Sequence, residues 1–143
     1  TVMVQECLAI ARKILARSPE ELFVVCGPIS TGKRSVAENL EIFKQTVCWF
    51  GITQDTFNQL LFEPIFEKVH SMLGAESSSM FFIDNFYEPI FTRTGKVWKP
   101  RFIDGWEYST GASAERRIFE RLGSEIVDFN SSPVSLDTLK DAE

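Results

Sequence analysis

The stretch Leu22–Gly27, which reads LFVVCG, decides the fold class. Its apolar residues follow one another without alternation, and the run ends at Gly27 and Pro28. Short runs of this kind are typical of a parallel strand that is buried on both faces of a sheet. Segments with helical spacing separate this run from three further segments that we predict to be strands: 56–62, 101–105 and 125–129.

The alternation of strands and helices predicts a doubly wound α/β fold of the Rossmann or flavodoxin type. We expect a parallel sheet of about four to five strands in the order 2-1-3-4, with helices on both faces. Residues 1–130 would form one domain that begins with a helix at 3–17, and residues 131–143 would form a polar tail. In this order the first and third strands are neighbours and the chain leaves them in opposite directions, which creates a ligand-binding switch point.

The composition narrows the choice of partner. The chain has 143 residues, a formal net charge of −5 and a pI near 5.0. Proteins that follow a nucleic-acid backbone need a basic face, so we expect no nucleic-acid polymer as partner, whereas a small nucleotide needs only a local anion site. No apolar run approaches the ~20 residues of a membrane span, and no signal peptide is visible. We therefore expect a cytoplasmic protein without a membrane partner.

Metal and cofactor chemistry has little support in the sequence. The three cysteines, Cys7, Cys26 and Cys48, lack the spacing of metal ligands, and His70 is the one histidine. An odd number of cysteines in a domain of this size is typical of buried thiols in a reducing compartment. We expect neither a metal ion nor a cofactor.

The segment 27–35, GPISTGKRS, has the spacing of a phosphate-binding P-loop. Gly27, Gly32 and Lys33 match G-x-x-x-x-G-K-[ST], but Arg34 occupies the position where the motif needs a hydroxyl to bind Mg²⁺. Pro28 also lacks the N–H group that such a loop presents to phosphates. Two interpretations remain beside the ligand site proposed below: a degenerate P-loop NTPase, and a simple Gly-Pro turn without a ligand.

A second loop, 105–117, reads GWEYSTGASAERR and leads into a helix expected near 112–122. Glu115 would lie in the first turn of that helix, where the helix dipole favours an ionised carboxylate. Such a group can act as a nucleophile or as an electrostatic stabiliser. Ser109 and the N–H groups of the helix start could hold a phosphate. In the alternative interpretation, Glu115 is only a helix-start acid and Ser109 only a helix cap.

The two loops together resemble the nucleoside 2-deoxyribosyltransferase superfamily, which includes 2′-deoxynucleoside 5′-phosphate N-hydrolases. The resemblance covers residues 23–129 and depends on CGPIS at 26–30 and on GWEYSTGASAE at 105–115. Uncharacterised members of the superfamily carry G-W-x-x-S-x-G-A-x-x-E. This chain matches that form at Gly105, Trp106, Ser109, Gly111, Ala112 and Glu115.

The resemblance implies a reaction at the N-glycosidic bond of a nucleoside or nucleotide. Glu115 would attack the anomeric carbon of a deoxyribose to form a glycosyl–enzyme ester, which water or a second base would then resolve. A serine at position 109 implies a nucleoside monophosphate rather than a free nucleoside. The implied substrate-binding residues are Gly27, Pro28, Ile29, Ser30, Trp106, Ser109, Gly111 and Ala112.

The acid that would assist Glu115 has two candidates. Asp84 is the nearest match to the acidic residue that the superfamily carries before the third strand, and Asp104 is the alternative. The resemblance also implies a homodimer or a higher homo-oligomer. A non-catalytic module that binds a nucleotide derivative on the same fold is the main alternative function, because a fold does not guarantee a chemistry.

Overall fold

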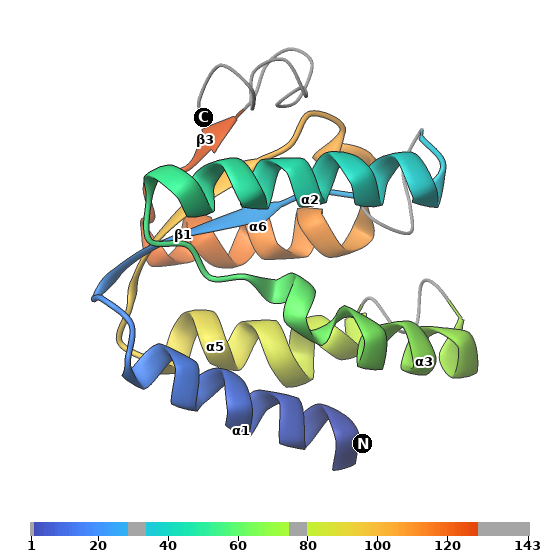
Figure 1. Ribbon diagram of the computed structural model, residues 1–143, viewed down its shortest axis with the longest axis horizontal. Coiled ribbons are helices and arrows are strands. Elements are labelled where there is room, and N and C mark those ends of the chain that lie inside the picture. Colours follow the sequence, from blue (N-terminus) through green and yellow to red (C-terminus); the bar gives the residue numbers. More distant parts are fainter. Residues whose placement is uncertain (1, 29–33, 75–79, 129–143) are drawn as a thin grey trace.

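The computed structural model describes residues 2–28, 34–74 and 80–128 of the chain. Over these ranges the protein is a mixed α/β structure that is mostly helical and has a small open parallel sheet (Figure 1). In chain order the elements are α1 (Val2–Ala16), β1 (Glu21–Cys26), α2 (Val36–Thr53), the 3₁₀-helix η1 (Gln59–Phe62), α3 (Glu63–Leu73), the π-helix η2 (Ile83–Tyr87), α5 (Glu88–Arg93), β2 (Val97–Phe102), the 3₁₀-helix η3 (Trp106–Tyr108), α6 (Thr110–Leu122) and β3 (Val127–Asp128).

The sheet contains three parallel strands in the order β1-β2-β3 within the described residues. β2 begins at Val97, four residues before the predicted start of that strand, and all six of its residues pair with β1. β3 is shorter than predicted, since only Val127 and Asp128 pair with β2. The described sheet is therefore smaller than the expected four to five strands.

The prediction of a strand at 56–62 was wrong. Only Thr56 pairs with β1, in a single parallel bridge to Phe23. The Asn58 side chain then accepts a hydrogen bond from the backbone N–H of Leu60 and starts η1. The side-chain amide of Gln59 donates to the backbone oxygen of Val25. A side chain thus takes the place of the backbone donor that a continuing strand would have offered to β1.

Pro100 lies inside β2, although proline has no N–H group to donate to a neighbouring strand. The N–H group of Val97 donates to the carbonyl oxygen of Glu20, just before β1, and that of Ile103 donates to Cys26, the last residue of β1. Because N–H groups alternate along a strand, the position of Pro100 faces the opposite edge. β3 pairs there only from Arg101 onward, so the proline interrupts no observed ladder bond.

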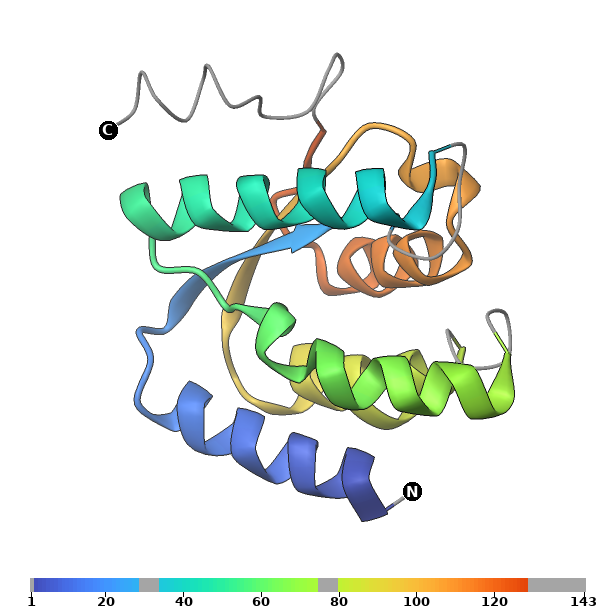
Figure 2. The same cartoon turned by 45° about the vertical axis from the view of Figure 1, so that its right-hand side comes forward.

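Helices cover both faces of the sheet, but unequally. Figure 2 shows α2 on one side of the strands, with α1, α3, α5 and α6 on the opposite side. Under α2, a small core joins Phe43, Val47 and Phe50 to Val25 and Ile103 of the strand ends. The second face carries the larger core, which is rich in phenylalanine and includes residues of α1, α3, η2, α5 and α6. None of the described helices is long and apolar enough to cross a membrane.

Local sequence signals place the helix ends. Ser35 and Glu38 form a capping box at the start of α2. Gly74 ends α3, and Gly123 ends α6 in the left-handed conformation that favours glycine. A π-helical turn, η2, lies immediately before Glu88 and Pro89 at the start of α5. π-helical turns inside helices are frequent at functional sites.

Candidate functional site

Described residues after β1 and at the start of α6 line one cavity of about 340 Å³. Gly27, directly after β1, forms part of its wall. Ser109, Gly111, Ala112 and Glu115 contribute a second part from the start of α6. The rest of the lining comes from α2, η1, α3 and the segment that includes η2. The fold thus brings together the β1 and α6 segments that the sequence singled out.

Glu115 is the central polar group of this cavity. Its side chain is buried, with an exposed fraction of 8%, and the thiol of Cys26 donates a hydrogen bond to Oε2 over 3.6 Å. Burial raises the pKa of Glu115 to about 8, while the hydrogen bond from Cys26 lowers it in part. The neutral carboxylic acid therefore predominates at pH 7.

The expectation that Glu115 stays ionised was wrong for the free protein. α6 begins at Thr110, two residues earlier than predicted, so Glu115 lies in the second turn. The helix dipole acts mainly on the first turn. Loss of hydration at the buried carboxyl group raises its pKa by more than the helix dipole lowers it.

Ser109 is the N-cap of α6. Its hydroxyl oxygen accepts a hydrogen bond from the backbone N–H of Ala112 over 3.2 Å, and its side chain is buried. Ser113 donates its backbone N–H to the carbonyl oxygen of Ser109. Two of the N–H groups at the start of this helix are thus bonded within the protein, as the cap interpretation of Ser109 expected.

The lining also contains polar residues that were not among the predicted site residues, and three of them bear on its chemistry: Gln59, Glu63 and Tyr87. Burial, and then the charge of Glu67, raises the pKa of Glu63, while Lys44 opposes this shift. Burial raises the pKa of Tyr87 well above its ordinary value, and Glu115, Glu63 and Cys26 add to the shift. These residues share no motif with the two loops. They come from η1, α3 and η2, and only the tertiary structure brings these elements to the cavity.

Gln59 is the most deeply buried of the three. Its exposed fraction is 4%, and its Nε2 group donates to the backbone oxygen of Val25. Its Oε1 atom is buried and has no hydrogen-bond partner among the described residues. A buried acceptor without a donor is unfavourable, and in native proteins it often marks a place for a water molecule or ligand.

The other predicted site residues lie elsewhere. Asp84 is exposed and lines a separate hollow with Glu88 and Arg121. Asp104 lines a polar hollow that includes Pro28 and Arg34. Neither aspartate is in the lining of the cavity that contains Glu115. Ile29 and Ser30, together with Gly32 and Lys33 of the P-loop-like segment, lie outside the described residues.

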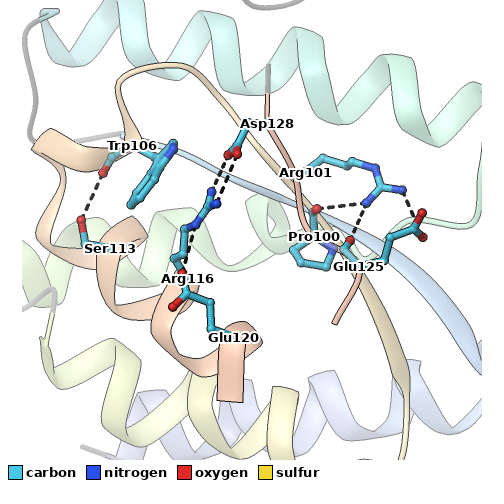
Figure 3. A network of polar contacts seen from close by, with 8 residues as sticks. All are labelled: Pro100, Arg101, Trp106, Ser113, Arg116, Glu120, Glu125 and Asp128. Atoms are coloured by element: carbon cyan, nitrogen blue, oxygen red, sulfur yellow. Dashed lines mark hydrogen bonds and ion pairs between the residues drawn. The ribbon is translucent and has the colours of Figure 1, made fainter. Parts of the chain in front are cut away.

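Trp106 packs against other side chains of the protein. Its ring packs edge-on against Phe102, and the guanidinium group of Arg116 lies 4.4 Å from its ring centroid. Arg116 also forms a two-pronged ion pair with Asp128 in β3 and a further contact with Glu120, as Figure 3 shows. This cluster fixes α6, and with it Glu115, against the carboxyl end of the sheet.

The described residues contain no group of three or more His, Cys, Asp or Glu side chains arranged to hold a metal ion. Comparison of the chain with protein-family models, with curated proteins and with solved structures found no match. The resemblance to the nucleoside 2-deoxyribosyltransferase superfamily therefore depends on the residues of the two loops alone.

Proposed function

We propose that the protein binds a nucleoside or nucleotide in the cavity beside Glu115 and cleaves or transfers its N-glycosidic bond. One observation carries the proposal: Gly27, directly after β1, lines a common cavity with residues at the start of α6, and Cys26 of β1 contacts Glu115, 89 positions further along the chain. The volume of about 340 Å³ lies in the range of small-molecule sites. The bridge between Phe23 and Thr56 lies on the edge of β1 where a doubly wound sheet has its second strand, which supports that fold as part of the proposal.

In the proposed reaction, the ionised form of Glu115 attacks the anomeric carbon. The bond from that carbon to the base nitrogen breaks, and its electron pair leaves with the base, which takes up a proton. An ester then joins the sugar to Glu115 until water or a second base displaces the carboxylate. Glu63 is the better candidate for the proton donor than Asp84 or Asp104, because it lines the same cavity and burial raises its pKa.

The test is to incubate the protein with the four 2′-deoxynucleosides and their 5′-monophosphates and to measure the released base by chromatography. We expect release from at least one substrate, and a loss of at least a hundredfold in Glu115→Gln. Glu41→Gln, at an exposed site on α2, is the matched control. The absence of released base with every substrate, or full activity in Glu115→Gln, would refute the proposal.

A second function is favoured by the protonation of Glu115. A carboxyl group with a pKa of about 8 is mostly neutral at pH 7 and is then a poor nucleophile. It remains a good hydrogen-bonding group, which suits a module that binds a nucleoside derivative without cleaving it. Saturable binding of an intact nucleoside without any turnover between pH 6 and pH 9 would favour this function.

A further inference from the structure

Glu115 presents one carboxyl oxygen to the cavity. The residue is more than nine-tenths buried, and its Oε2 atom accepts the hydrogen bond from the thiol of Cys26. Oε1 receives no hydrogen bond from the described residues. It is also not fully enclosed, because the enclosed side-chain atoms without a partner belong to Gln59 and Trp98. Since Glu115 lines this cavity and neither of the two hollows described above, a ligand in the cavity can reach Oε1.

The charge of Glu115 depends on what occupies the cavity. Its pKa of about 8 leaves the neutral acid in about tenfold excess at pH 7, although the proposed reaction, on which this inference rests, needs the carboxylate. A positive charge within about 4–6 Å favours the ionised form of a carboxyl group and lowers its pKa by about 1 to 3. A cationic ligand would therefore ionise the nucleophile as it binds, whereas a neutral ligand would leave it mostly protonated.

Two carboxyl groups on α3 also favour a positive charge in the cavity. Glu63 and Glu67 both belong to the lining. After burial, the charge of Glu67 has the largest effect on the pKa of Glu63, and it exceeds the opposing effect of Lys44. The field at Glu63 is thus already one that attracts a cation. An imidazolium group at His70, which lines the cavity as well, would oppose a cation, so the tests below include this residue.

A positive charge on the base would also simplify the departure of the leaving group. When the bond from the sugar to a cationic base breaks, its electron pair neutralises the charged ring, and the base leaves without taking up a proton. A neutral base depends on a proton from Glu63 in the proposed reaction. The apolar wall, which includes Phe43, Phe66 and Phe82, suits a flat ring of either charge.

We propose that the cavity prefers a nucleoside whose base is positively charged, such as a pyridinium or an N-methylated purine, over a neutral nucleoside of the same shape. The bound cation displaces the proton of Glu115 to the solvent. The carboxylate then attacks the anomeric carbon, the bond to the base nitrogen breaks, and the base leaves as a neutral molecule. The common 2′-deoxynucleosides remain slower substrates, because they leave Glu115 mostly neutral.

The ligand arm of the test uses two pairs of compounds that differ in charge but little in shape. Nicotinamide 2′-deoxyriboside is paired with the benzamide C-nucleoside, in which carbon replaces the charged ring nitrogen. The cation 1-methyl-2′-deoxyadenosine is paired with its neutral N6-methyl isomer. Isothermal titration calorimetry at pH 7 should show that at least one cation binds ~10-fold more tightly than its partner, the factor that corresponds to a change of 1 in pKa. Equal or tighter binding of the neutral compound in both pairs would overturn the proposal.

The proton arm repeats these titrations in buffers with different ionisation enthalpies, such as PIPES and MOPS, to count the protons released on binding. If the pKa of Glu115 falls from about 8 by 1 to 3, a cation releases roughly 0.4–0.9 of a proton at pH 7. The neutral partner should release much less. Glu115→Gln should lose this release, or lose cation binding alone, whereas the exposed control Glu41→Gln should retain both. Cation binding with the same release in Glu115→Gln, or without any release in the wild type, would contradict the proposal.

Other charged or titratable groups face this site from every described element around it. They are Cys26, Lys44, Glu63, Glu67, His70 and Tyr87. Two variants on α3 measure their influence. Glu67→Gln should narrow the preference for the cation several-fold, and His70→Gln should maintain or widen it. A wider preference in Glu67→Gln would show that the carboxyl groups of α3 do not attract the ligand.

The outcomes separate this inference from the proposed activity. Preferred binding of a cation with proton release, but without released base from any nucleoside, would support the inference and refute the activity. Released base from neutral nucleosides, without any preference for a cation in binding, would support the activity and refute the inference.

Discussion

The thiol of Cys26 and the carboxyl group of Glu115 form a buried hydrogen bond, with 3.6 Å between Sγ and Oε2. It joins the end of β1 to the second turn of α6 and lowers the otherwise raised pKa of Glu115. In Cys26→Ala we expect the pKa of Glu115 to rise further, whereas Cys26→Ser retains a donor and should keep it lower. Carbon-13 NMR titration of the glutamate carboxyl groups measures both. An unchanged pKa in Cys26→Ala would contradict this role of the thiol.

Burial of Glu115 makes the stability of the protein depend on pH. Its folded pKa of about 8 lies above the ordinary value of 4.5, so the folded protein keeps a proton that the unfolded chain loses between these values. This contribution is complete below pH 4.5 and is lost as the pH rises through about 8. Glu115→Gln should therefore gain stability over the wild type between pH 5 and pH 8, by on the order of a few kcal/mol.

Urea unfolding of both proteins at several pH values measures this difference. Because burial also raises the pKa of Glu63 at this cavity, the comparison with Glu115→Gln isolates the contribution of one group. Glu107→Gln, at an exposed position in η3, should follow the wild type at every pH. Parallel pH profiles of the wild type and Glu115→Gln would show that Glu115 is not the group responsible.

Gly27 has no space for a side chain. A Cβ atom at this position would lie 2.9 Å from Cβ of Ile103, a β-branched residue in the core under α2. Gly27→Ala should therefore destabilise the protein by about 1–3 kcal/mol through overpacking. Gly111 also lines the cavity, but a Cβ there meets nothing within 4 Å. Gly111→Ala should be neutral or slightly stabilising in thermal unfolding, because alanine favours the helix.

The contacts of Arg116 should not tolerate lysine. Its planar guanidinium group stacks on Trp106 and pairs through two nitrogens with Asp128, a geometry that an ammonium group does not reproduce. We expect Arg116→Lys to lose about 1–2 kcal/mol of stability and to shift the indole N–H resonance of Trp106. Arg117→Lys, at the exposed neighbouring position, is the control. An unmoved Trp106 resonance would mean that the stacking does not persist in solution.

The three thiols should differ in reactivity. Cys48 is exposed, whereas Cys7 and Cys26 are buried, and burial raises the pKa of both buried thiols. Because the thiolate is the reactive form, a disulfide reagent should modify Cys48 in the folded protein and the other two only after unfolding. Mass spectrometry of tryptic peptides would locate the modification. Rapid modification of Cys26 in the folded protein would indicate that the site next to Glu115 opens to solvent.

The sequence alone predicted the features that depend on a few neighbouring residues. The apolar run before Gly27 indicated β1, and the local patterns of Ser35 with Glu38 and of Gly123 coincide with the start of α2 and the end of α6. These signals are reliable because a cap or a buried strand is decided within one or two turns of chain. The topology rule for parallel sheets also led to the expectation that the β1 and α6 loops share a site.

Tertiary contacts decided the rest. The segment at 56–62 has residues suited to a strand, yet the side-chain bond from Gln59 to Val25 and the cap by Asn58 turn it into η1. The expected position of Glu115 near the start of α6 favoured an ionised carboxylate, yet burial raises its pKa so that the neutral acid predominates at pH 7. Desolvation depends on everything packed around a group, including Tyr87 from a distant helix, and no local sequence pattern records that. The sequence therefore drew attention to Gly27 and to the start of α6, and only the packing determined the protonation of Glu115 and the rest of the lining of the cavity between them.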